Sequence, residues 1–167
     1  MQNLLVLAKM DEGSDALPTS EFSLSLLAGE VLDFYQEAAA AKGICLDAVI
    51  QPDVMLRANR ESIVQLLSVL LDNAVQYTPT EGSIQVVLTK EKSGIVVQVE
   101  NSVDTPPDGD LERLFDRFYR GDPARTQKSG GYGIGLSAAR AVAEAHGGTV
   151  TARYDWPRAT MIFTVKL

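Results

Sequence analysis

The 167-residue chain has one cysteine, one histidine and no long apolar run. A single cysteine cannot close a disulfide within the chain, and one thiol with one imidazole cannot complete a tetrahedral zinc site. No apolar stretch approaches the roughly 18 residues of a membrane helix, and the amino terminus lacks the basic and apolar segments of a signal peptide. We therefore expect a cytoplasmic chain that makes no contact with a membrane.

Basic residues are also scarce, because 15 lysines and arginines face 22 acidic residues, for a net charge of −7. A negative protein repels polyanions, so we expect no nucleic-acid partner. Residues 1–83 carry 4 basic and 12 acidic residues, whereas residues 84–167 carry 11 and 10. A short basic segment suits a small anionic ligand better than a polymer. Its members are Arg113, Arg117, Arg120, Arg125 and Lys128.

The hydrophobic content of 46% is enough for one folded core. Apolar periodicity predicts a helix capped by Ser23 and ending near Lys42, a second between Asn59 and Thr78, and a third from about Ser137 to Gly147. The first is expected to bury Leu26, Leu27, Val31, Phe34 and Ala38, and the second Ile63, Leu66, Leu67, Leu70, Ala74 and Tyr77.

Strands are expected between these helices, and most of them follow or precede a strand that is their neighbour in sequence. This order predicts an α/β (α+β) two-layer sandwich, with a mixed, mostly antiparallel sheet covered on one face by about three helices. The expected strands are residues 44–50, 54–56, 84–89, 95–100, 149–153 and 160–166.

Asn73 falls on the apolar face of the second predicted helix, between Leu70 and Ala74 and one turn before Tyr77. A buried amide needs a hydrogen-bond partner. That partner could be a backbone group, or the amide oxygen could bind magnesium beside phosphates. The residue pattern leaves both interpretations open.

Four glycines stand immediately before the third predicted helix. Backbone amides at glycines and at a helix N-terminus favour phosphate, although the spacing matches neither a Rossmann nor a Walker motif. A turn that serves tight packing alone is the alternative. The glycines are Gly130, Gly131, Gly133 and Gly135.

The segment 101–130 is a long loop that contains the basic cluster, and it could fold back so that Arg117, Arg120 and Lys128 meet a polyphosphate. A solvated basic loop is the alternative. Aromatic residues that could anchor it are Phe115, Phe118 and Tyr119.

Two further polar residues stand at the ends of predicted elements. Asn101 ends the strand 95–100 and could accept a hydrogen bond from a ligand's amino group. His146 lies in the last turn of the third helix, where a histidine meets terminal carbonyls, so we expect a structural role for it.

Five segments together resemble the catalytic ATP-binding domain of two-component sensor histidine kinases, over roughly residues 20–167. They are QLLSVLLDNAVQYTP (65–79), VENS (99–102), LFDRFYRGD (114–122), GGYGIGLSAARAVAEAHGG (130–148) and ATMIFTVKL (159–167). The resemblance implies that residues 1–19 are the end of a dimerisation and phosphoacceptor helix plus a linker, and that residues 20–167 are the catalytic domain.

The resemblance also implies the activity and the partners. ATP and Mg²⁺ are the implied cofactors, and the γ-phosphate would pass to a histidine on the dimerisation domain of the same protein, which is absent from this chain. A response regulator would act downstream. The parent protein would be membrane-anchored, and the isolated domain is expected to be a monomer.

The family's functional residues carry over to matching positions here. Asn73 and Arg120 would be catalytic, with Asn73 as the magnesium ligand, and residues 102–130 would form the ATP lid. The implied nucleotide-binding residues are Asn73, Gln76, Tyr77, Asn101, Phe115, Arg117, Arg120, Lys128, Gly131, Gly133, Gly135 and Leu136.

Three positions depart from the relatives. Asn101 replaces an aspartate that accepts the adenine amino group, and Gln76 replaces a lysine; Arg117 or Lys128 could compensate. Val69 stands where DNA gyrase and heat-shock chaperone ATPases have a water-activating glutamate, which disfavours a mechanical ATPase or mismatch-repair relative. A degenerate nucleotide-binding or interaction module descended from such kinases is the alternative reading of these departures.

Overall fold

The structure, a computed structural model, describes residues 17–117, 119 and 135–167. Its main sheet has five strands in the order β2-β4-β5-β7-β6. β2 pairs with β4 in parallel, and the other neighbouring strands pair antiparallel. The strands are β2 (Cys45–Ile50), β4 (Ser83–Glu91), β5 (Gly94–Ser102), β6 (Thr149–Asp155) and β7 (Thr160–Lys166).

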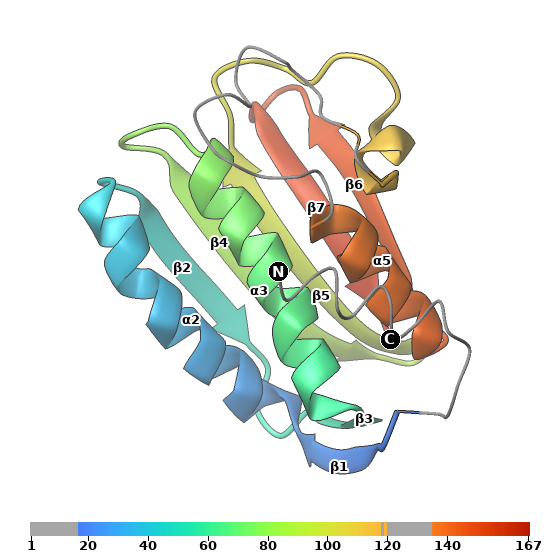
Figure 1. Ribbon diagram of the computed structural model, residues 1–167. Helices are drawn as coiled ribbons and strands as arrows, with labels where there is room; N and C mark the ends of the chain where they lie inside the picture. Colours follow the sequence, from blue (N-terminus) through green and yellow to red (C-terminus); the bar gives the residue numbers. More distant parts are fainter. Residues whose placement is uncertain (1–16, 118, 120–134) are drawn as a thin grey trace.

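The α-helices of the described residues all lie over one face of this sheet (Figure 1). α3 (Arg60–Tyr77) occupies the centre of the layer, between α2 (Leu24–Ala41) and α5 (Gly135–Ala145). The predicted two-layer sandwich with a mixed, mostly antiparallel sheet is thus confirmed. No helix within these residues combines the length and apolarity needed to span a bilayer.

A second, small sheet was not predicted from the sequence. β1 (Ser20–Ser23) pairs antiparallel with β3 (Met55–Ala58), and Phe22 lies opposite Leu56. The strand expected at residues 54–56 therefore exists but begins one residue later. β1 escaped prediction because a four-residue segment with three polar residues carries no clear alternation of apolar side chains.

α2 begins and ends where the sequence predicts but buries a different face. The Ser23 hydroxyl accepts from the Leu26 amide at 3.2 Å, and Gly43 stops the helix with a φ of 70°. The expected burial of Leu26, Phe34 and Ala38 is wrong, because all three are exposed, Leu26 by 71% and Phe34 by 78%. Apolar residues occupy two overlapping stripes of this helix, and the buried one is Leu24, Leu27, Ala28, Val31, Leu32, Tyr35 and Ala39.

α3 follows its prediction closely. The Asn59 side chain caps it by accepting from the Ser62 amide at 2.9 Å. The predicted apolar stripe is buried from Ile63 to Ala74, whereas Tyr77 at its end is only partly buried. α3 therefore carries its last turn out of the core toward the edge of the sheet.

Candidate functional site

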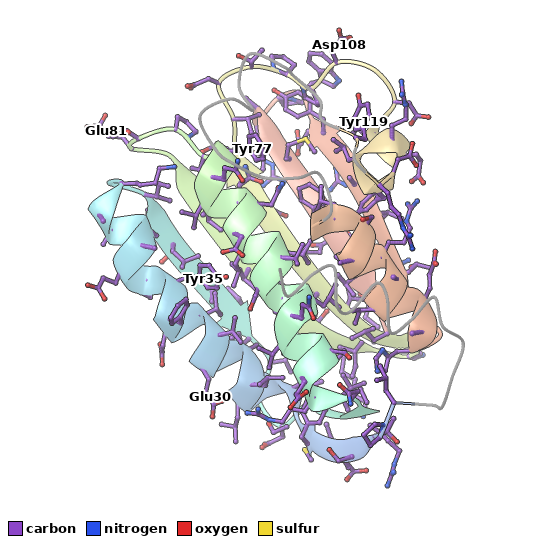
Figure 2. The ribbon with its side chains drawn as sticks, viewed as in Figure 1. Glu30, Tyr35, Tyr77, Glu81, Asp108 and Tyr119 are labelled. Atoms are coloured by element: carbon purple, nitrogen blue, oxygen red, sulfur yellow. The ribbon has the colours of Figure 1, made fainter. Side chains whose placement is uncertain are left out.

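The predicted site residues of the described chain meet at one edge of the molecule. The register pairs Asn101 with Ile84 and Ser102 with Thr160, so the end of β5 lies beside the starts of β4 and β7. α3 ends at this edge and α5 begins there (Figure 1). Figure 2 shows Tyr77 at the same end of the molecule as Asp108 and Tyr119. The residues brought to this edge are Asn73, Gln76, Tyr77, Asn101, Gly135 and Leu136.

Three of these residues lie on the last two turns of α3. Asn73 and Tyr77 are one turn apart and both partly buried, whereas Gln76 is exposed. Among the described residues, no hydrogen bond occupies the Asn73 amide. The backbone partner that was one interpretation of Asn73 is therefore not found there, and its oxygen is available to a ligand.

Two carbonyls in the C-terminal turn of α3, those of Ala74 and Val75, have identified hydrogen-bond donors. The amide and hydroxyl of Thr78 both donate to the Ala74 carbonyl, at 3.0 Å and 2.5 Å. The Val75 carbonyl would normally accept from the residue four positions on, but that residue is Pro79, which has no N–H. Lys42, the residue that caps the C-terminal end of α2, donates to this carbonyl instead, at 2.6 Å.

A second contact from α2 holds the residue just before Asn73. The hydroxyl of the buried Tyr35 donates to Asp72 Oδ1 at 2.7 Å and also lies 3.1 Å from the Ser68 carbonyl. Burial, together with the adjacent Asp72 carboxylate, raises the pKa of Tyr35 well above its usual value. Asp72 and Val75 bracket Asn73, so both contacts fix the backbone that carries it.

Asn101 is the most deeply buried polar residue of the site, at 1% exposure. It ends the row of β5 residues, with Val97 and Val99, whose side chains face the helices. Its Nδ2 donates to the Ser102 carbonyl at a long 3.4 Å, and its Oδ1 has no partner. A buried acceptor left unpaired costs roughly 1–3 kcal/mol, which a donor on a ligand would offset.

Phe115 anchors the start of the loop that follows β5. It closes the short 3-10 helix η1 (Leu111–Phe115) and is buried, with its ring edge-on to Phe163 at 6.4 Å between centroids. The Arg140 guanidinium lies 4.2 Å from the centroid of the Phe115 ring, and its Nη2 forms an ion pair with Glu112 Oε2 at 2.7 Å. Arg140 was not identified from the sequence, where the only signal is one arginine in an alanine-rich helix.

The remaining predicted residues divide into two groups. Arg117 is exposed, and Leu136 is half-buried against the core just after α5 begins at Gly135, two residues earlier than predicted. The other group, with residues 118 and 120–130 of the expected lid, lies outside the described residues. That group is Phe118, Arg120, Lys128, Gly131 and Gly133.

Two residues expected to have no chemical role occupy structural positions. Val69 is buried, with 6% exposure, on the flank of α3 that also carries Asn73. His146 Nε2 accepts from the Asn59 amide at 3.1 Å, and its Nδ1 lies 2.7 Å from the Val142 carbonyl. His146 therefore joins the end of α5 to the start of α3. In the described part of the chain, no acidic, histidine and cysteine side chains cluster as a metal site.

Comparison with known proteins agrees with this arrangement. Residues 58–167 match the family model described as histidine kinase-, DNA gyrase B- and HSP90-like ATPase. The chain is 32% identical over 169 residues to the sensor protein CiaH of Streptococcus pneumoniae, covering 99% of this chain and 36% of CiaH. It is 34% identical over 155 residues to the sensor histidine kinase CusS of Escherichia coli, covering 93% of this chain and 32% of CusS.

The fold agrees with a solved catalytic domain. The nucleotide-free catalytic domain of histidine kinase ThkA superposes with a TM-score of 0.76 at 26% identity, covering 90% of this chain and 95% of that domain. The chain spans about a third of the length of its curated relatives. Its residues, its fold and its relatives place it in the family of histidine kinase-, DNA gyrase B- and HSP90-like ATPases, as a catalytic ATP-binding domain of the sensor histidine kinase type.

Proposed function

We propose that this chain binds Mg·ATP at the edge formed by α3, β5 and α5, and donates the γ-phosphate to a histidine on a separate dimerisation domain. The observation that carries the proposal is the unpaired, buried Oδ1 of Asn101 at the same edge as the open amide of Asn73. One is suited to the amino group of adenine, and the other to a hard cation beside the phosphates.

The proposed site has a base end and a phosphate end. Asn101 lies at the base end, with Tyr77 and Leu136 lining the pocket, and Gln76 at its exposed rim. Asn73 would hold Mg²⁺, which when bound neutralises phosphate charge. The residues proposed to meet the phosphates, directly or by positioning the loop, are Phe115, Arg117, Arg120, Lys128, Gly131, Gly133 and Gly135, of which Arg120 is catalytic.

Transfer to a side chain is favoured over transfer to water. Val69 lies one turn before Asn73 on the same flank of α3, and a buried valine cannot remove a proton from water. Both ring nitrogens of His146, the only histidine of the chain, are in contact with backbone groups, Nε2 with the Asn59 N–H before α3 and Nδ1 with the Val142 carbonyl of α5. Catalysis would then rest on positioning and on charge stabilisation.

The partners follow from the same proposal. The acceptor histidine would lie on the dimerisation domain of the parent protein, with residues 1–19 as the end of that domain and the linker. A response regulator would take the phosphate next. We propose that the catalytic domain alone is a cytoplasmic monomer and that the parent is membrane-anchored.

Calorimetric titration of the chain with ADP, carried out once with Mg²⁺ present and once with the metal removed by a chelator, tests the proposal. Mg²⁺ should tighten wild-type binding at least tenfold, and Asn73→Ala should remove that gain. Gln98→Ala is the matched control, because Gln98 is an amide on the opposite face of β5. Wild-type binding that is indifferent to Mg²⁺ contradicts the metal role of Asn73.

A degenerate module remains the second candidate, because Asn101 carries no charge and Gln76 is an exposed amide rather than a cation. The same titration separates the two functions. Absence of nucleotide binding at millimolar concentration would support the module. The kinase would be supported if the chain binds nucleotide and transfers phosphate from ATP to a supplied dimerisation domain without phosphorylating itself.

A further inference from the structure

The Asn101 side chain offers a ligand two different hydrogen-bonding groups. Its Oδ1 accepts from no group, and its Nδ2 makes only the 3.4 Å contact to the Ser102 carbonyl. That distance is at the outer limit of an N–H···O hydrogen bond, for which about 2.9–3.0 Å is typical. Neither end of the amide is therefore firmly held by the protein.

The surroundings of Asn101 do not select one orientation of the amide. Its neighbours across the two adjoining strands are Ile84 and Met161, which are both buried and apolar. Among the described residues, no side chain donates to or accepts from this amide. A half-turn about the last side-chain bond exchanges oxygen and nitrogen. It gives up the long contact to Ser102 and turns Oδ1 toward that carbonyl, a cost that new hydrogen bonds to the base would have to offset.

We propose that Asn101 accommodates both classes of purine base, those with a 6-amino group and those with a 6-oxo group. This inference rests on the proposed nucleotide site and adds its base selectivity. In one orientation, Oδ1 accepts from a 6-amino group, and Nδ2 faces the N1 acceptor of the same base. In the other, Nδ2 donates to a 6-oxo group, and Oδ1 accepts from N1–H.

A carboxylate at this position would not have this freedom. When ionised it offers acceptors only, so the oxygen facing the 6-position accepts from a 6-amino group but meets a 6-oxo group as like partial charge. The N1–H of a 6-oxo base can offset this only at the second oxygen. A site whose buried polar groups are left unpaired by the wrong ligand rejects that ligand strongly. The amide of Asn101 thus lowers discrimination at the 6-position, and a carboxylate would raise it.

Titration with ADP and with inosine diphosphate, both with Mg²⁺, tests this selectivity. Inosine diphosphate carries the 6-oxo group without the 2-amino group of guanine, so only the 6-position edge differs. The wild-type Kd values should agree within about fivefold. Asn101→Asp should raise the ratio of the inosine to the adenosine Kd at least tenfold, while Gln98→Glu, on the opposite face of the same strand, leaves it unchanged.

Asn101→Leu covers the case in which a buried carboxylate prevents folding. Because the leucine lacks both hydrogen-bonding groups of the amide, it should raise the Kd values of ADP and of inosine diphosphate by similar factors. A wild-type preference for ADP above fiftyfold overturns the inference, as does Asn101→Leu binding both nucleotides as tightly as wild type. If wild type binds neither nucleotide, the proposed function itself fails; if it binds ADP alone, the function stands and this inference falls.

Discussion

The two flanks of α3 are built differently. Toward α2, polar contacts hold the helix up to its last turn, from Tyr35 to Asp72 and Ser68 and from Lys42 to the Val75 carbonyl. Toward α5, small buried residues fill the interface, and His146 makes a polar contact just after the C-terminal end of α5. The α5 residues that share the main core with α3 are Ala139, Val142 and Ala143.

Asn73 lies on the flank of α3 away from these polar contacts with α2. Asp72 points to Tyr35 of α2, and the next residue of a helix is rotated by about 100°. Asn73 is therefore turned away from α2, in line with Val69 one turn below. The comparison shows a division of roles between the two sides of the helix: the contacts toward α2 hold the backbone, and the proposed ligand-binding residue faces the other way.

Overpacking the α5 flank should have the largest effect on stability. Ala139 has 0% exposure, so Ala139→Leu must displace neighbours, and we expect a loss of about 1–3 kcal/mol in the free energy of unfolding. Urea denaturation measures it. Ala38→Leu on the exposed face of α2 is the matched control, with a change within about 0.5 kcal/mol. Equal effects at the two positions would contradict the assignment of buried faces.

Removing the Tyr35 hydroxyl should weaken the α2 flank by about 1 kcal/mol, the usual value of one hydrogen bond. Tyr35→Phe keeps the ring and loses both contacts. Tyr154→Phe is a suitable control, because Tyr154 has a ring contact with Trp156 and no hydroxyl partner in the described chain. Denaturation curves that coincide for wild type and Tyr35→Phe would rule out the contact as a stabilising one.

The raised pKa of Tyr35 also predicts a dependence on pH. The unfolded tyrosine ionises near pH 10.0, but the folded one does not, so its contribution is fully present below that pH and is lost as pH rises above it. Unfolding measured between about pH 9 and 11 should show a steeper fall for wild type than for Tyr35→Phe. Parallel curves would argue against the burial of this hydroxyl.

Loss of the Lys42 contact should have the smallest effect, because the lysine is exposed. Lys42→Met leaves the Val75 carbonyl to water, and we expect a loss of about 0.5 kcal/mol, with Lys42→Arg close to wild type. Lys92→Met removes the same charge from the exposed turn between β4 and β5. If Lys92→Met costs as much as Lys42→Met, net charge rather than the carbonyl explains the loss.

Sequence patterns predicted the layers, the sheet type and the helix caps at Ser23 and Asn59, because these depend on local spacing. The buried face of α2 could not be chosen, since two apolar stripes overlap and only the packing of the folded core selects the one containing Tyr35. Contacts between distant residues, such as Lys42 with the carbonyl left free by Pro79, need the tertiary fold. β1, and with it the β1–β3 pairing, was missed because its four residues show no clear alternation of apolar side chains.

The site itself was predictable in part. The spacing of Asn73 and Tyr77 and the strand-end position of Asn101 are local features, and the fold brings them to one edge. That Asn101 is almost fully buried with an unpaired oxygen is a property of packing that no pattern in the sequence reveals. The stacking of Arg140 on Phe115 likewise arises only when α5 and η1 meet.

The most direct test of the proposed site uses the side-chain amide signals of the chain labelled with ¹⁵N-asparagine. Asn59, at the other end of α3, serves as an internal control. Its side-chain amide is already hydrogen-bonded, with Oδ1 accepting from the Ser62 N–H and Nδ2 donating to the Pro18 carbonyl. Titration with Mg·ADP should shift the signals of Asn73 and Asn101 saturably and leave that of Asn59 in place. Saturable binding that moves Asn59, or leaves both Asn73 and Asn101 unmoved, would contradict a nucleotide site at this edge.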